Sequence, residues 1–247
     1  MAVGADAQIT DLTVDDHACL TFGEPEDLLD LTAAFVRDGL AGGLKVVWVS
    51  EAGTQRAASE LTRRGIAVEP ALASGQMAAA DSEGCLLSGQ AFSASQAIGW
   101  LSELMAACRQ EGFPGLRVAV DMSWALRPVI GVEQLPDFEE SVAKALAGTT
   151  VSVLCQYDRE RFDPVTLATV TAFHTRSVAT RSGGVSLSHT TFRPPASPSL
   201  MNAAVRSSSS SGSPNVRHAW SFTVRSVIWV SALIVIVFLV MSGPRAS

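Results

Sequence analysis

The stretch "HACLTFGEPEDLLDL", residues 17–31, decides the fold. Its first six residues predict a buried strand, and apolar residues at helical spacing predict a helix from about Glu26 to Gly39. A strand that passes through a glycine into a helix is how a phosphate-binding loop begins, because the helix N-terminus and backbone N–H groups attract anionic oxygens. The first question is therefore whether Gly23 opens such a loop.

The residues that would bind phosphate are missing from this loop. Counted from Gly23, the pattern GxxxxGK[ST] meets Leu28, Leu29 and Asp30 where the second glycine, the lysine and the hydroxyl residue should stand. At an effective dielectric constant near 20, like charges about 4 Å apart cost roughly 4 kcal/mol. Three acids lie where the triphosphate would bind and would repel it: Glu24, Glu26 and Asp27. Acids do suit the first turn of a helix, because the helix dipole favours negative charge there. We expect a protein that is not an ATPase or another enzyme and that uses no cofactor.

Strand-like and helix-like segments alternate along the chain. "LKVVWVS", residues 44–50, is too continuously apolar for an exposed strand and predicts a central parallel one. This alternation predicts an α/β fold with a mostly parallel sheet and helices on both faces. The predicted strands are residues 17–22, 44–50, 66–70, 76–81, 116–124 and 149–158, and the predicted helices are residues 26–39, 54–65, 93–112, 132–148 and 163–176.

Ligands of such sheets bind where the strands end, at their carboxyl edge. Glu51 and Asp121 follow two core strands and would line a pocket or cap the next helices. Trp124 would stack on an organic ligand or belong to the core. The candidate ligand-binding residues are His17, Glu51, Asp121, Trp124, Tyr157 and Arg161.

Three of these candidates allow two interpretations each. His17 either contacts a ligand and responds to pH, or is a strand-edge histidine bonded to nearby backbone. Tyr157 and Arg161, within "QYDRERF", either offer a hydrogen-bonding anion clamp or form a salt-bridged turn. His174 ends the last predicted helix and can stabilise its C-terminus.

The cysteines predict buried, reduced thiols rather than a metal site. None of the four belongs to a CxxC pair, and a zinc site would need such paired spacings. Apolar residues flank each of them: Cys19, Cys85, Cys108 and Cys155. The two remaining histidines, His189 and His218, have no neighbouring residues that indicate a role.

Charge divides the chain into two parts. All 24 acidic residues lie within residues 1–163, whereas residues 164–247 carry seven arginines and no acid. The acidic part argues against binding of nucleic acid, and the acid-free part favours a membrane or another anionic surface. Only two of the 18 basic residues are lysine, a bias typical of bacteria with GC-rich genomes.

The C-terminal part predicts a membrane anchor. Residues 226–244 are 19 residues without a charge, enough for a helix of about 28 Å across a bilayer core of roughly 30 Å. Arg217 and Arg225 precede this run and Arg245 follows it, which favours a cytoplasmic N-terminal domain. We expect a single-pass protein of the cell membrane, although a decayed or frameshifted tail is an alternative.

These observations divide the chain into four regions. Residues 1–15 carry no signal peptide and predict a flexible N-terminus. Residues 16–192 form the folded domain, residues 193–219 a linker rich in serine and proline, and residues 220–247 the membrane helix with a short tail.

The folded domain resembles a known family. "FVRDGLAGGLKVVWVSE" and "LRVAVDMSWAL" resemble two segments of KaiC-like ATPases of the RecA fold. "DHACLTFGEPEDL", "FVRDGLAGG", "GFPGLRVAVDMSWAL" and "LCQYDRERFDPVTLATVTAFH", between residues 16 and 174, more specifically resemble the MEDS domain, the sensory domain of methanogens, methylotrophs and DcmR. The resemblance implies a RecA-like domain without its phosphate loop that senses small organic ligands, usually ahead of an output module. A linker and a predicted membrane helix follow here instead.

Three functions are consistent with the sequence. The first is a membrane-tethered, non-catalytic sensor that binds a small organic ligand at the carboxyl edge of the sheet. The second is a module that binds a signalling protein, such as an anti-sigma or kinase-like protein, without a small ligand. The third is a residual nucleotide binder that uses Glu51, Asp121 and the arginines of "DRERF".

Overall fold

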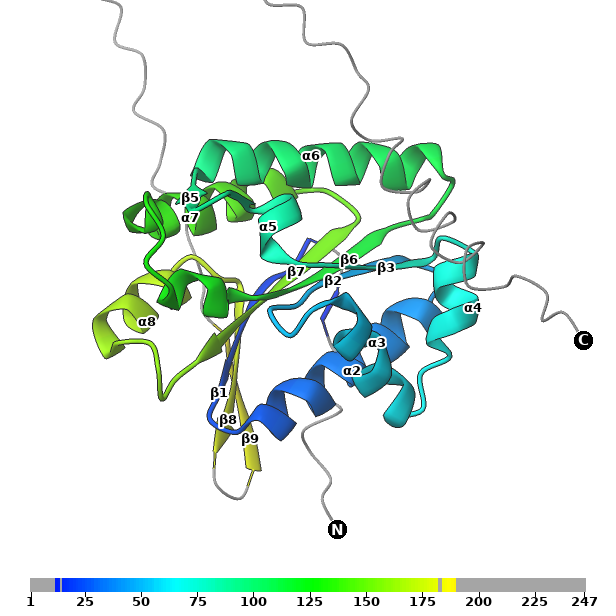
Figure 1. Cartoon of the computed structure of the whole chain (residues 1–247), viewed down its shortest axis with the longest axis horizontal. Coiled ribbons are helices and arrows are strands. Elements are labelled where there is room, and N and C mark those ends of the chain that lie inside the picture. The colour runs from blue at the N-terminus through cyan, green and yellow to red at the C-terminus, as the bar shows by residue number, and fades with distance from the viewer. Residues whose placement is uncertain (1–11, 14, 182–183, 190–247) are drawn as a thin grey trace, which may run out of the picture. The chain divides into compact units, whose positions relative to one another are not determined.

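The computed structural model describes residues 12–13, 15–181 and 184–189. They lie in the first of two units into which the chain divides, Met1–Pro195. A seven-stranded sheet runs through the middle of this unit, with helices above and below it (Figure 1).

The sheet is mostly parallel, as the sequence predicts. Its strand order is β3-β2-β6-β7-β1-β8-β9, and each neighbouring pair from β3 to β8 is parallel, whereas β9 runs antiparallel to β8. The strands are β1 (His17–Phe22), β2 (Lys45–Val49), β3 (Met77–Ala80), β6 (Leu116–Asp121), β7 (Val151–Asp158), β8 (Arg176–Arg181) and β9 (Gly184–His189).

Helices cover both faces of the sheet (Figure 1). One face carries α2 (Pro25–Ala41), α3 (Thr54–Arg63) and α4 (Val68–Ala73), and the other carries α6 (Ala94–Gln110) and α7 (Leu135–Leu146). Shorter elements complete the described residues: α5 (Ser82–Cys85), α8 (Pro164–Thr171), the 3-10 helices η1 (Met122–Leu126) and η2 (Val132–Gln134), and the hairpin of β4 (Leu87–Ser88) and β5 (Ala91–Phe92).

The continuously apolar β2 shows why both faces need cover. Val46 and Trp48 belong to the core that packs against α2 and α3. Val47 and Val49 point the other way, into the core of α6 and α7. Because alternate side chains of a strand point to opposite faces, a strand buried on both sides must be apolar at every position.

Three predicted elements differ from the structure. The strand predicted for residues 116–124 ends at Asp121, and Met122–Leu126 form η1. Residues 66–70 form no strand, because the chain enters α4 at Val68 and Pro70 lies in the first turn of that helix, where its missing N–H costs little. The last helix was predicted to reach residue 176, but α8 ends at Thr171 and Arg176 begins β8. The sequence interpretation also missed α5, β4, β5, β8 and β9.

The predicted tail lies outside the described residues. This holds for the linker at residues 193–219, the membrane helix at residues 226–244 and His218. Within the described ranges, none of the helices combines the length and the hydropathy that crossing a membrane requires. Most of the N-terminus predicted to be flexible, residues 1–11 and 14, is likewise not described.

Candidate functional site

The loop after β1 is filled by the protein's own side chains. A Cβ atom added to Gly23 would lie 2.3 Å from Nη2 of Arg159, so the guanidinium packs directly against the loop backbone. The Nη1 atom of Arg159 donates to the hydroxyl of Thr180 at 3.1 Å. Arginine thus takes up space beside the loop, and no lysine follows at the start of α2.

Two acids near the start of α2, Glu26 and Asp30, share one arginine as partner. Arg64, at the end of α3, forms ion pairs with Glu26 and with Asp30, the latter with 2.8 Å between Nε and Oδ1. Glu26 and Asp27 stand in the first turn of α2, where the helix dipole favours acids. The ion pairs of Glu26 and Asp30 with Arg64 thus link α2 to the end of α3.

Glu51 and Asp121 lie at the carboxyl ends of neighbouring strands, as predicted. The Glu51 carboxylate is 3.3 Å from Nη2 of Arg127. Asp121 is buried and caps η1, because its Oδ1 accepts a hydrogen bond of 3.0 Å from the N–H of Ser123. Asp121 therefore has the capping role that the sequence offered as one of its two alternatives.

Trp124 is a core residue. Its side chain is fully buried and packs on Phe92, with 4.6 Å between the ring centroids. The indole N–H has no hydrogen-bond partner among the described residues. With no exposed face, Trp124 stacks on no ligand in this conformation, and the core alternative holds.

His17 and Tyr157 meet in a buried polar cluster around Glu139. The Oε2 atom of Glu139 lies 3.0 Å from Nε2 of His17 and 3.4 Å from Nε2 of His174. The hydroxyl of Tyr157 donates to the other oxygen, Oε1. The Cys155 thiol is 3.5 Å from Oε2, and all five side chains are fully buried. His17 is the first residue of its strand, but its side chain contacts Glu139 rather than nearby backbone.

Burial governs the protonation of this cluster. It raises the pKa of Cys155 well above the ordinary thiol value, and the nearby Glu139 carboxylate adds to the rise. Burial, assisted by His17, lowers the pKa of His174 to about 3. Although burial disfavours a charged carboxylate, the imidazoles of His174 and His17 and the Tyr157 hydroxyl hold the pKa of Glu139 below its usual value. At neutral pH, Glu139 is a carboxylate and His174 a neutral imidazole.

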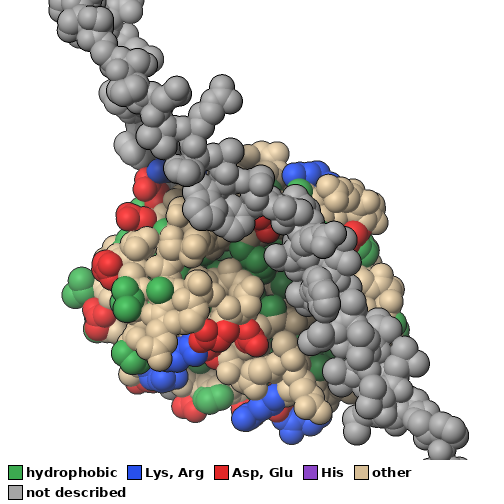
Figure 2. All heavy atoms as spheres, turned by 45° about the horizontal axis from the view of Figure 1, so that its top comes forward, with side chains coloured by type: hydrophobic (Ala, Val, Ile, Leu, Met, Phe, Trp, Pro, Cys, Tyr) green, Lys and Arg blue, Asp and Glu red, His purple; other side chains and the backbone are tan. Residues whose placement is uncertain are grey.

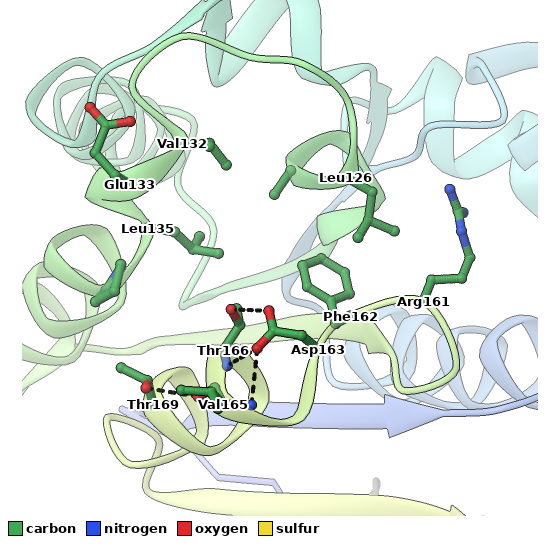
Figure 3. Close-up of a pocket in the computed structure, with 12 residues that line it drawn as sticks. Leu126, Val132, Glu133, Leu135, Arg161, Phe162, Asp163, Val165, Thr166 and Thr169 are labelled. Carbon is green, nitrogen blue, oxygen red and sulfur yellow. Dashed lines mark hydrogen bonds between the residues drawn. The ribbon is translucent and has the colours of Figure 1, made fainter.

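A groove with a volume of about 490 Å³ opens at the carboxyl edge of the sheet (Figure 3). Its walls come from η1, from η2 with the start of α7, and from the loop that leads into α8. The apolar lining includes Leu126, Val132, Leu135 and Phe162, and the polar lining includes Glu133, Arg161, Asp163, Thr166 and Thr169. Arg161 is thus part of the groove lining, and its role in ligand binding stays a prediction.

Phe162 connects the groove to the buried cluster. Its ring lies between the groove walls in Figure 3 and packs edge-on against Tyr157, with 5.1 Å between centroids. Asp163, the next residue, caps α8 through N–H groups of Val165 and Thr166. The predicted candidates therefore fall into separate places: His17 and Tyr157 in the cluster, Arg161 in the groove, and Glu51 and Asp121 beside Arg127 and η1.

Glu139 is the residue that the sequence interpretation missed. It stands in "PDFEESVAKAL", where acids at 137, 139 and 140 look like a solvated helix face. The signal that distinguishes Glu139 is its spacing from the apolar Phe138 and Val142, which places it at the border of the buried face of α7. A buried carboxylate with several polar partners indicates a functional site.

Solved structures with a similar fold agree with the sheet and helix arrangement described above. The fold is that of RecA-like proteins: FlaH, a flagellar accessory protein of Methanocaldococcus jannaschii, has 13% identity, a TM-score of 0.51 and coverage of 73% of this chain and 79% of its own. The KaiC-like protein PH0186 of Pyrococcus horikoshii has 12% identity and a TM-score of 0.49, over 70% and 76%. No curated protein matches the sequence.

The sequence places the chain in a family. The model of the MEDS family, the methanogen/methylotroph, DcmR sensory domain, matches residues 16–175. The protein belongs to the MEDS family, and its described part is a sensory domain with a RecA-like fold.

Proposed function

We propose that this protein is a non-catalytic sensor whose groove at the carboxyl edge of the sheet binds a small organic molecule. The observation that carries the proposal is the groove itself. Its volume of about 490 Å³ falls within the range typical of small-molecule sites, roughly 300–1,000 Å³. Open parallel sheets bind their ligands at this edge.

The lining favours a small, largely apolar compound with one polar end. Leu126, Leu135 and Phe162 offer apolar contact, and the Arg161 guanidinium offers hydrogen bonds to a carboxylate or another anionic oxygen. Glu133 and Asp163 disfavour a ligand with several negative charges, such as a nucleoside triphosphate. This balance supports an organic acid, alcohol or similar metabolite.

The ion pairs of the loop after β1 support the absence of catalysis. Arg159 packs on Gly23 and Arg64 pairs with Glu26 and Asp30, so rearrangement of several contacts would precede phosphate binding. A fold that keeps its sheet edge but lacks a phosphate-binding lysine is suited to recognition rather than phosphoryl transfer.

The test is a ligand screen on the full chain with a blocked groove as control. Thr169 lies in the groove and Thr62 on the exposed side of α3, and each donates its hydroxyl to the carbonyl four residues earlier, at 2.8 and 2.9 Å. A compound that binds the groove raises the melting temperature of the wild type and of Thr62→Trp, but not of Thr169→Trp. A broad metabolite panel without any such compound would overturn the proposal.

A second candidate function is docking of a signalling protein at the same edge. Val165, which lines the groove, is 76% exposed, and Ile130, just before η2, is 75% exposed. Large exposed apolar side chains are the residues that interfaces bury. Cross-linking in native membranes at Val165 recovers a reproducible partner under this alternative, and an empty result counts against it.

Under this proposal, the C-terminal tail anchors the sensor in the cell membrane. The uncharged run at residues 226–244 would anchor the domain, and the arginines before it favour a domain on the cytoplasmic side. The full chain then fractionates with membranes and resists extraction by high salt, whereas a chain truncated after residue 219 is released. Release of the full chain by salt alone would contradict a spanning anchor.

A further inference from the structure

Four potential metal ligands converge inside the fold from separate elements. His17 opens β1, Glu139 lies in α7, Cys155 lies in β7 and His174 follows α8. Each offers one ligand atom, and these atoms all lie within 4.8 Å of one another in a fully buried position. None of the four lines the groove, so a metal ion could bind here whether or not the groove holds a ligand.

Four of the six distances between these atoms lie near the edge length of a tetrahedral metal site. Bonds of about 2.0–2.3 Å to nitrogen, oxygen and sulfur place tetrahedral ligands about 3.3–3.7 Å apart. The Oε2 atom of Glu139 is 3.0 Å from His17 Nε2, 3.4 Å from His174 Nε2 and 3.5 Å from Cys155 Sγ. Cys155 Sγ is 3.6 Å from His17 Nε2. Small shifts therefore suffice to surround one ion.

The orientation of His174 also points to a cation. Its Nδ1 lies 2.8 Å from the carbonyl oxygen of Val170. Because a carbonyl only accepts, Nδ1 donates to it, and Nε2 is the ring nitrogen that remains to bind a metal. That nitrogen is buried, has no hydrogen-bond partner among the described residues and lies 3.4 Å from Oε2 of Glu139. A metal ion bound between these two atoms would give both of them a partner.

The surrounding contacts resemble the second layer of a metal site. Metal-binding histidines commonly donate their other ring N–H to a backbone carbonyl, as His174 does to Val170. The ligating carboxylate is usually hydrogen-bonded as well, and Tyr157 donates to the oxygen of Glu139 that faces away from the histidines. The orientations of His174 and Glu139 are therefore fixed before any ion binds.

Charge and ligand type select the ion. One carboxylate and one thiolate balance a divalent cation, and two neutral imidazoles complete four ligands. Coordination deprotonates a thiol that otherwise stays protonated, and the proton leaves to solvent. A mixed nitrogen, sulfur and oxygen set suits Zn²⁺ and similar borderline-soft ions rather than Mg²⁺ or Ca²⁺.

We propose that His17, Glu139, Cys155 and His174 form a tetrahedral site for a divalent transition metal, with Zn²⁺ as the expected ion. All four positions come from the protein, so the site is of the closed, structural type. The ion links β1 and β7 to α7 and to the residue after α8. Because α7 and α8 also line the groove, metal occupancy fixes the groove walls.

The experiment measures metal binding to the full chain purified in mild detergent. Co²⁺ replaces Zn²⁺ as an optical probe, because tetrahedral Co²⁺ with a thiolate ligand gives strong visible bands and a near-ultraviolet charge-transfer band. We expect one Co²⁺ per chain, with both spectral signatures, and displacement by one equivalent of Zn²⁺. A chain that binds no Co²⁺ after treatment with chelator and reductant overturns the proposal.

Cys19 provides a matched control for Cys155. The two residues are partners in the register of β1 and β7, and both are fully buried. Cys155→Ala should abolish the charge-transfer band and lower Zn²⁺ affinity more than about 100-fold, since it removes a ligand rather than a supporting contact. Cys19→Ala should leave both unchanged. Equal affinity in the two variants overturns the proposal.

A second variant separates loss of the ligand from loss of the fold. Glu139→Gln keeps the shape of the side chain, and circular dichroism reports whether each variant folds. If Cys155→Ala does not fold, Glu139→Gln replaces it: a folded Glu139→Gln chain should bind Zn²⁺ at least about tenfold more weakly. Unchanged affinity in folded Glu139→Gln contradicts the assignment. If neither folds, the wild-type cobalt spectrum decides.

Discussion

Phe162 packs edge-on against Tyr157, with 5.1 Å between the ring centroids and 75° between the ring planes. Phe162 lines the groove, and Tyr157 donates its hydroxyl to the buried Glu139. One aromatic contact therefore joins the proposed ligand site to the buried cluster. A ligand that displaces Phe162 would shift Tyr157 and so change its hydrogen bond to Glu139, without any movement of the sheet.

The first prediction concerns the hydroxyl of Tyr157, the one tyrosine of the chain. Tyr157→Phe keeps the ring but leaves an oxygen of the buried Glu139 carboxylate without its donor. Removing one partner of a buried polar group costs about 1–3 kcal/mol. Urea unfolding followed by circular dichroism should show a loss of this size. A change below about 0.5 kcal/mol, typical of surface substitutions, would contradict the contact.

The second prediction concerns thiol reactivity. Burial, followed by the charge of Glu139, raises the pKa of Cys19 to about 12, against an ordinary value of 9.0. The thiolate fraction at pH 8 is then about 1,000-fold lower than in an exposed thiol. Mass spectrometry after brief alkylation should find Cys19 unmodified in the native chain and modified after denaturation. Rapid native alkylation would refute its burial.

The third prediction concerns Gly131, which begins the turn into η2 beside the groove. Its φ is 87°, and an added Cβ would lie 2.3 Å from the carbonyl oxygen of Phe92. Gly53 is the matched control, because its φ is 85° and an added Cβ meets nothing within 4 Å. Both alanine variants bear backbone strain of about 1–2 kcal/mol, and Gly131→Ala should lose a further 1–3 kcal/mol, roughly, from the clash. Equal losses in urea unfolding would contradict this packing.

The fourth prediction concerns the cap of α8. The hydroxyl and N–H of Thr166, then the N–H of Val165, lower the pKa of Asp163 from its usual 3.8. Because the folded pKa is depressed, this stabilisation is fully present above pH 3.8 and is lost as the pH falls through the folded value. Asp163→Ala should lower the melting temperature at pH 7, and Asp163→Asn, which retains an accepting oxygen, should lower it less.

The comparison for Asp163 also depends on pH. The difference in melting temperature between wild type and Asp163→Ala should narrow as the pH falls below 3.8, because the unfolded wild-type chain then binds a proton at Asp163 more readily than the folded chain does. A difference that grows with acidity would reverse the sign of the linkage and contradict the cap.

Local pattern was enough to predict most of the fold. The apolar run of β2 indicated a strand buried on both faces, and Asp163-Pro164 indicated the start of α8. The end of α8 could not be predicted in this way. The helix stops at Thr171 and His174 turns inward to Glu139, a partner 35 residues earlier in the chain. Likewise, residues 66–70 have strand-like composition, but packing of Val68 places them at the start of α4.

Fewer residues of the candidate site could be predicted from the sequence. Arg161, Asp121 and Glu51 lie at the end of a strand or shortly after it, so inspection of the carboxyl edge of the sheet included them. The cluster required knowledge of the sheet order, because His17 and Cys155 come together only when β1 pairs with β7. Without a CxxC pair, the spacing of its members gave no metal signal, and metal ligands brought together by tertiary structure leave no short motif.

Acidic and basic side chains are interspersed on the part of the surface that Figure 2 shows. On the face drawn in Figure 2, basic side chains lie in small separate groups beside acidic ones. Arg64 with Glu26 and Asp30, and Arg127 with Glu51, are examples of such pairing.

The central claim is that this RecA-like domain senses an organic molecule and has lost its nucleotide. The most direct test measures the melting temperature of the full chain with Mg-ATP and with each compound of a metabolite panel. A ligand at 100 times its dissociation constant adds about 2.7 kcal/mol, a shift of several degrees. The account predicts no shift with Mg-ATP and a shift with at least one organic compound. A shift with Mg-ATP that Asp121→Ala removes would contradict it.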